Sequence, residues 1–192
     1  MSALELANKL KAKFGELVAE PTEFRSEVTL KLSDPAQIYE VCNFAKRQLG
    51  FDFLVDITSV DNYGEDPRFT IIYHLRNLAA NVELRLKMEV SEEKSEIASV
   101  ITVWRSANWH EREIYDMMGI RFAGHPDLRR ILMWEGYPYF PLRKDFPLAG
   151  KPTDLPNVAF TEPAPLEGGP FVTVAENADS TAREPRVRNP EE

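Results

Sequence analysis

The stretch FTIIYHLRNLAANVELRLKMEV, residues 69–90, alternates apolar and polar side chains in two successive runs. The apolar members of the first run are Phe69, Ile71, Tyr73 and Leu75, and the second run extends from Val82 to Val90. A period of two residues is typical of a β-strand with one buried face. The short connection over residues 77–81 therefore predicts an antiparallel hairpin, one face of which lies on the core and the other in water.

Two further segments alternate in the same way and predict one strand each. The first covers residues 24–32, with apolar residues Phe24, Val28, Leu30 and Leu32. The second covers residues 51–57, with apolar residues Phe51, Phe53, Val55 and Ile57. Together with the hairpin, these segments predict a sheet of about four strands.

Helical periodicity accounts for most of the remaining N-terminal sequence. Residues 4–17 predict an amphipathic helix that Pro21 ends, and a second helix begins at Asp34-Pro35 and ends at Gly50. Residues 95–104 fit either a short helix capped by Ser95 or a strand over 100–103. Asn108 and Glu111 have the spacing of a capping box, which predicts a helix that ends at Gly119.

This order of elements predicts an α+β fold with three parts. Residues 1–120 form a two-layer domain with a mixed sheet and helices over one face. Residues 121–150, rich in proline and aromatic side chains, form an extended partner-binding arm, or else a long loop folded back on its own domain. Residues 151–192 form an acidic tail with seven of the 14 prolines. The tail carries four apolar anchors for a partner: Phe160, Phe171, Val172 and Val174.

Composition excludes several kinds of site. The 192 residues carry a net charge of −8, which disfavours nucleic-acid binding, and contain one cysteine, Cys42, interpreted as a small buried hydrophobe. An iron–sulfur cluster needs about four thiolates, so this chain alone cannot hold one. Phosphate-binding glycine loops are absent, and His110-Glu111 fails as a zinc-protease motif because Ile114 stands where the second histidine is required. We therefore predict no catalytic, cofactor-binding or metal-binding residue.

Two segments are more distinctive than the rest of the chain. The first is EREIYDMMGIRFAGHPDLRRIL, residues 111–132, and the second is YPYFPLRKDFPL, residues 137–148. Together with DITSVD at residues 56–61, they resemble the signature of the 30-kDa subunit, also called the C subunit, of respiratory complex I, the proton-translocating NADH:quinone oxidoreductase. The resemblance extends over residues 20–150.

The resemblance implies a non-catalytic subunit of the hydrophilic arm of complex I, which passes electrons from NADH through FMN and iron–sulfur centres to quinone. It implies that this chain holds no cofactor and that FMN and the clusters belong to partner subunits. The partners implied are the D subunit, which helps to form the quinone site, and the neighbouring B and I subunits. The residues implied at the interface with partners are Glu111, Arg112, Glu113, Asp116, His125, Arg129, Arg130, Arg143, Lys144 and Asp145.

The implied location is the cytoplasmic face of a bacterial inner membrane, which the chain reaches only through the complex. Residues 1–14 agree with this expectation, because they contain neither an apolar signal core nor an arginine. Two alternatives stay open. One is the equivalent subunit of a membrane-bound hydrogenase or of a ferredoxin-dependent complex. The other is a freestanding enzyme with a carboxylate site around Asp56, Asp61 and Glu111.

Overall fold

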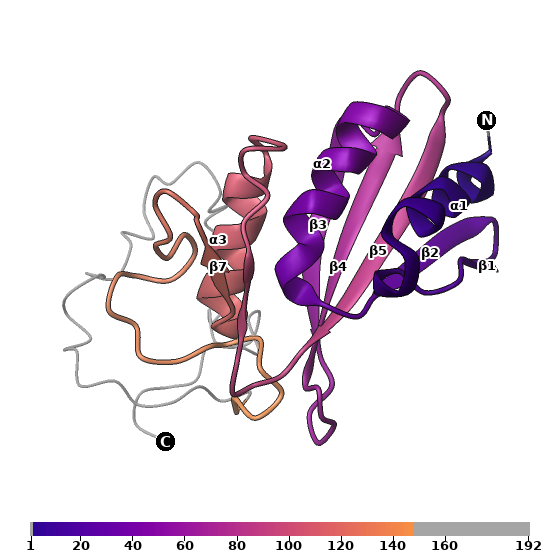
Figure 1. Cartoon of the computed structure of the whole chain (residues 1–192). Helices are drawn as coiled ribbons and strands as arrows, with labels where there is room; N and C mark the ends of the chain where they lie inside the picture. Colours follow the sequence, from indigo (N-terminus) through magenta and orange to yellow (C-terminus); the bar gives the residue numbers. More distant parts are fainter. Residues whose placement is uncertain (1, 148–192) are drawn as a thin grey trace, which may run out of the picture. The chain divides into compact units, whose positions relative to one another are not determined.

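The computed structural model describes residues 2–147, which belong to one compact unit, Met1–Lys151 (Figure 1). Its helices are α1 (Ala3–Phe14), α2 (Ile38–Leu49) and α3 (Ala107–Met118), with 3₁₀ turns at Gly15–Leu17 and Pro35–Gln37. Its strands are β1 (Thr22–Phe24), β2 (Glu27–Leu32), β3 (Phe53–Asp61), β4 (Phe69–Asn77), β5 (Val82–Val90), β6 (Glu96–Ala98) and β7 (Arg121–Ala123). The tail predicted for residues 151–192, with its four apolar anchors, lies outside the described residues.

The main sheet has the strand order β1-β2-β5-β4-β3. Strand β2 runs parallel to β5 and the other pairs are antiparallel, which confirms the predicted mixed sheet and the α+β class. The sheet has five strands because the segment expected as one strand is a hairpin. Arg25 and Ser26 turn the chain with φ of 51° and 67°, so Phe24 is 68% exposed and is not part of the core.

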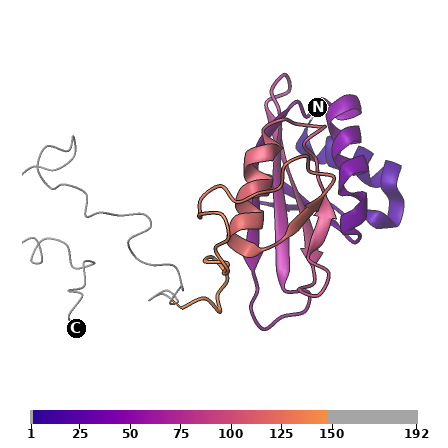
Figure 2. The same ribbon diagram turned by 90° about the vertical axis from the view of Figure 1, so that its left-hand side faces the viewer.

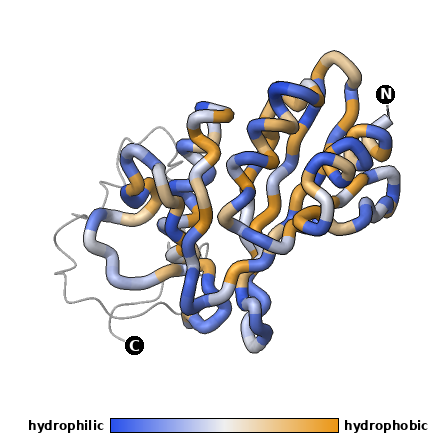
Figure 3. The backbone as a smooth tube through the Cα atoms, viewed as in Figure 1, coloured by the Kyte–Doolittle hydropathy of each residue, from blue (hydrophilic) through white to orange (hydrophobic). Residues whose placement is uncertain are grey.

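The predicted hairpin of β4 and β5 forms the centre of the core. Tyr73 pairs with Leu86 and Leu75 with Leu84, and all four side chains are buried. Helices α1 and α2 lie across this face of the sheet (Figure 1) and contribute apolar side chains to the same core, including Leu6, Leu10, Val41 and Cys42. Figure 3 shows apolar positions recurring along both helices and the central strands.

Strand β3 differs from its predicted pattern. The register between β3 and β4 shifts between Leu54 and Asp56, so the alternation of the strand changes side at this bulge. As a result Leu54 and Ile57 are buried, whereas Phe53 and Val55 are nearly half exposed. The first helix also differs from its predicted span, because α1 ends at Phe14 and not near Pro21. Gly15 follows it as the C-cap, with a φ of +59° that favours glycine.

The segment 95–104 forms neither predicted alternative. It contains β6, which pairs in parallel with β7 through Ile97 and Phe122, followed by turns. The boundary predicted at residue 120, between the α+β domain and the arm, therefore falls between β6 and β7, which pair with each other.

Helix α3 begins at Ala107 after Ser106, whose side chain makes no capping hydrogen bond, so the predicted capping box is wrong. The predicted end of the helix at Gly119 is confirmed. No helix within residues 2–147 is long and apolar enough to cross a membrane.

Substitution of Leu86 tests this account of the core. Leu86 is fully buried opposite Tyr73, so Leu86→Ala is expected to lower the free energy of unfolding by about 2–5 kcal/mol. Lys87→Ala is the matched control, because Lys87 lies on the other face of β5 and should change stability by less than about 0.5 kcal/mol. Urea unfolding measures both variants, and equal effects would contradict the assignment of faces.

Candidate functional site

The candidate site is formed by α3 and by residues 124–147, here called the arm segment. The arm segment follows β7 and lies beside α3 in two views at right angles (Figures 1 and 2). It contains no helix or strand, and side chains make most of the hydrogen bonds that hold it to α3. Within the described residues the arm segment is folded back on its own domain, and its predicted contact with a partner stays a prediction.

Asp116 of α3 is the first anchor of the arm segment. Its carboxylate is fully buried, and Oδ2 accepts hydrogen bonds from the N–H groups of Ile131, Leu132 and Met133 at 3.0, 2.7 and 2.8 Å. Burial alone would raise the pKa of Asp116. The N–H of Met133, the guanidinium of Arg130 and the other two N–H groups outweigh burial and hold that pKa below its usual range.

Arg130 closes the same anchor from the arm side. Its Nη1 lies 2.5 Å from Asp116 Oδ1 and 2.9 Å from the Asp116 carbonyl oxygen. Its Nη2 donates to the carbonyls of Tyr137 and Tyr139 at 2.5 and 3.1 Å. The guanidinium also faces the rings of Tyr137 and Phe140. One arginine therefore joins the end of α3 to two further positions along the arm segment.

Arg112 holds the arm segment one turn of α3 earlier. Its Nε donates to the carbonyl of Arg129 at 3.1 Å and its Nη2 to the carbonyl of Arg130 at 3.0 Å. The guanidinium lies 5.6 Å from the centre of the Trp109 ring, within the range of a cation–π contact.

A second anchor lies where β3 and β4 meet. Arg68 is buried and makes a bidentate ion pair with Asp61, both contacts at 2.8 Å. It also pairs with Glu92 at 2.8 Å and with Asp145 of the arm segment at 2.6 Å. Asp61 Oδ2 accepts the N–H of Lys144 at 2.8 Å. The Arg68 hydrogen bond is the main cause that lowers the pKa values of both Asp61 and Asp145.

Arg143 lies between the two anchors, and Gly119 makes room for it. The Nε of Arg143 donates to the Met118 carbonyl at 2.7 Å, and its guanidinium stacks 4.6 Å from the Phe140 ring centre. A Cβ on Gly119 would come within 2.7 Å of Phe140 and 2.8 Å of Arg143. Gly119 therefore serves both the left-handed helix end, with φ of +78°, and this close approach.

Glu111 is buried on the opposite side of α3. Ser99 donates its hydroxyl to Oε2 at 2.6 Å and the N–H of Val100 donates to Oε1 at 2.7 Å. With only neutral donors to offset the loss of water, burial raises the pKa of Glu111 to about 7. Cys42 is fully buried, as predicted, and burial raises the pKa of its thiol.

The carboxylates of the predicted freestanding enzyme do not meet. Asp56 contacts His110 at 3.1 Å, Asp61 is bound to Arg68, and Glu111 is enclosed with Ser99. Within residues 2–147, no three His, Cys, Asp or Glu side chains are placed to hold a metal ion. This part of the chain presents a folded-back arm rather than a group of acids around a cavity.

Comparison with known proteins identifies the family. Residues 32–152 match the family model described as respiratory-chain NADH dehydrogenase, 30 Kd subunit. The chain belongs to this family. It is 51% identical over 135 residues to the second NADH-quinone oxidoreductase C subunit of Rhizobium meliloti (strain 1021), covering 69% of this chain and 74% of that protein. It is 45% identical over 142 residues to the NADH-quinone oxidoreductase C subunit of Geotalea uraniireducens (strain Rf4), covering 74% and 86%.

Two solved structures share the fold of this chain. The trypsin-resistant fragment of Nqo5 aligns with a TM-score of 0.57 at 28% identity, covering 65% of this chain and 97% of the fragment. A chain of an archaeal membrane-bound sulfane sulfur reductase aligns with a TM-score of 0.64 over 75% of this chain and 85% of that one. At 20% identity the latter likeness shows the fold alone.

The structure separates the predicted interface residues of this 30-kDa-type subunit into two groups. Glu111, Asp116, Arg130 and Arg143 point inward and bond within the chain. Arg112 and Asp145 also have partners inside the chain, and His125 accepts the N–H of Asp127 at 3.1 Å. Glu113, Arg129 and Lys144 have exposed side chains. Contact of any of the ten with a partner protein stays a prediction.

The sequence did not point to Arg68 or Glu92, and it indicated Asp61 as a candidate site residue only in the enzyme alternative. The signal for Arg68 lies in the register of the β3–β4 hairpin. Asp61 and Arg68 stand on either side of the turn at 62–67. Once β3 and β4 are paired, the two opposite charges therefore lie close together at the base of this turn. Glu92 follows β5 by two residues and carries no comparable local signal.

The raised pKa of Glu111 predicts how stability depends on pH. The folded chain keeps the proton up to a pH of about 7, whereas the unfolded chain loses it near 4.5. As the pH rises from 4.5 to about 7, the titration of Glu111 should therefore lower the free energy of unfolding by roughly 3 kcal/mol. Glu111→Gln should remove this slope, because an amide side chain does not titrate. The variant should still fold, because the amide can donate to the Ser99 oxygen and accept the Val100 N–H.

Urea unfolding of the full chain between pH 5 and pH 8 measures the effect. Glu113→Gln is the control, since Glu113 is exposed on the same helix and should leave the slope unchanged. A Glu111→Gln chain with the wild-type dependence on pH would show that Glu111 does not titrate in this window.

Proposed function

We propose that this chain is a structural subunit of the hydrophilic arm of a proton-translocating NADH:quinone oxidoreductase, complex I, and that it docks to its partners through α3 and the arm segment. The observation that carries the proposal is how the charged side chains of α3 and the arm segment are used. Asp116, Arg130 and Arg112 fold the arm segment onto α3, so their polar groups serve contacts within the chain. An ordered arm on a rigid domain suits recognition of a partner surface.

We further propose that the chain holds no cofactor. The whole sequence has one cysteine, and burial of Cys42 disfavours the thiolate that a metal would need. FMN and the iron–sulfur clusters are then held by partner subunits. The proposed partners are the quinone-site D subunit and the neighbouring B and I subunits, on the cytoplasmic face of a bacterial inner membrane. Bacterial relatives that are named as C subunits of the same complex support this setting.

A related membrane complex that uses a hydrogenase or a ferredoxin is the second candidate. The likeness to a chain of the sulfane sulfur reductase complex keeps this alternative open at the level of fold. The first is favoured because relatives 43–51% identical to this chain are named as NADH-quinone oxidoreductase subunits.

Purification of a tagged chain from membranes tests the proposal. We expect flavin- and iron–sulfur-containing subunits that oxidise NADH to co-purify with it, and the same chain purified alone to show neither absorption nor activity. Membranes carrying the untagged chain are the control. A flavin or cluster in the isolated chain would refute the cofactor claim, and co-purifying hydrogenase subunits without NADH oxidation would favour the second candidate.

A further inference from the structure

Two large apolar side chains are exposed, one on α3 and one on the arm segment. Trp109 is 58% exposed and Leu132 is 63% exposed. Exposed apolar side chains are common singly, but two that stand on one ordered surface favour an interaction site. Arg112 connects the two positions, because it stacks on Trp109 and binds the carbonyl of Arg130, two residues before Leu132.

Both side chains project from backbone that is already fixed. Trp109 belongs to α3, and the N–H of Leu132 is bound to the buried Asp116 at 2.7 Å. A partner that covered them would therefore lose little backbone entropy on binding. Tryptophan on a rigid support is also among the residues most often found to dominate binding energy.

Charges of both signs lie beside these two residues: the guanidinium of Arg112, which donates to two backbone carbonyls, and two glutamates that outnumber it. Glu113 lies one turn after Trp109 on the same side of α3, and Glu135 lies three residues after Leu132. Both are exposed, and neither has an ion-pair or hydrogen-bond partner within residues 2–147. The neighbouring acids differ, because Asp116 is neutralised by Arg130 and Asp127 by Arg129.

We propose that Trp109 and Leu132 are the apolar anchors of a protein-docking patch rimmed by Glu113 and Glu135, and that the patch fits an apolar cleft with basic side chains at its rim. This inference rests on the proposed function and deepens it. The buried charges of α3 and the arm segment position the patch, and the exposed apolar pair makes the contact. Complementary charge at the rim then sets the orientation and rate of docking.

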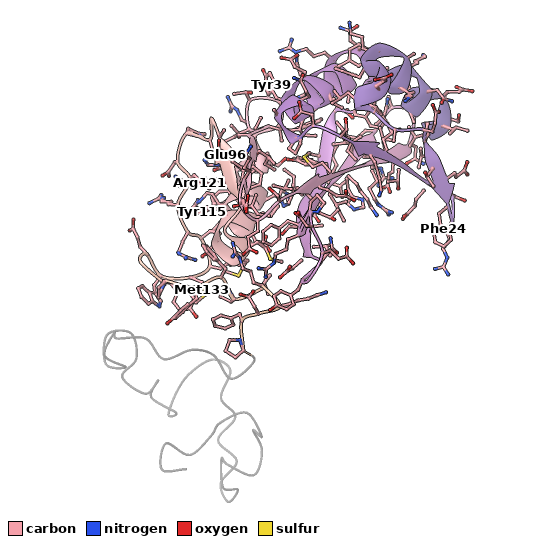
Figure 4. The ribbon with its side chains drawn as sticks, turned by 60° about the horizontal axis from the view of Figure 1, so that its bottom comes forward. Phe24, Tyr39, Glu96, Tyr115, Arg121 and Met133 are labelled. Carbon is pink, nitrogen blue, oxygen red and sulfur yellow. The ribbon has the colours of Figure 1, made fainter. Side chains whose placement is uncertain are left out.

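Release of the chain from the purified complex tests the patch. Trp109→Ala and Leu132→Ser should each speed release of the tagged chain in salt by roughly 30-fold, equivalent to about 2 kcal/mol. Phe24→Ser is the matched control, because Phe24 is 68% exposed but lies at the far end of the molecule from Met133 of the arm segment (Figure 4). It should release at the wild-type rate. Unchanged thermal unfolding midpoints of the three chains show that folding is intact.

Charge reversal tests the rim separately. Glu113→Lys with Glu135→Lys should speed release, and the corresponding pair of Gln variants should have a smaller effect in the same direction. Slower release of the Lys pair would overturn the basic rim, and wild-type release of both Trp109→Ala and Leu132→Ser would overturn the patch. Both of those outcomes leave the proposed function standing, whereas a wild-type chain that co-purifies with no other protein of the complex contradicts the proposed function itself.

Discussion

The hydrogen bonds to the Asp116 carboxylate are the interaction on which the candidate surface depends. A carboxylate removed from water needs donors for its lone pairs, and a buried one left without them is strongly destabilising. Three consecutive N–H groups and Arg130 supply those donors, and all of them come from the arm segment. Burial of Asp116 in α3 therefore requires the arm segment to fold onto the helix.

The buried carboxyl groups of this chain stabilise the fold in opposite protonation states. Asp61 and Asp116 have cationic or multiple N–H partners that lower their pKa values, so both stay charged at neutral pH and their contribution to stability is lost only in acid. Glu111 has only a hydroxyl and one N–H, its pKa is raised, and its proton is retained as the pH rises towards 7. The two aspartates fix the arm segment, whereas Glu111 ties the turn after β6 to α3.

Local patterns predicted the parts of the fold that local physics determines. The β4–β5 hairpin follows from its alternation, and the ends of α2 and α3 follow from glycines that adopt left-handed φ. The β1–β2 turn gave no such signal, because Arg25 and Ser26 occupy positive φ without glycine. The roles of Asp116 and Asp61 were hidden for another reason. Asp116 is held by residues 14 to 17 positions further along the chain, and Asp61 by residues 7 and 83 positions further along, so only the folded chain shows that these charges face inward.

Hydrogen exchange of the full chain, resolved to single amides, tests the central claim most directly. In the wild-type chain the amides of Ile131, Leu132 and Met133 should be protected despite lying outside any helix or strand. Asp116→Asn should remove that protection, because an amide N–H₂ replaces one acceptor oxygen, while the amide of Tyr73 in the central hairpin stays protected. Unchanged protection of residues 131–133 in the variant would contradict the claim that Asp116 holds the arm segment.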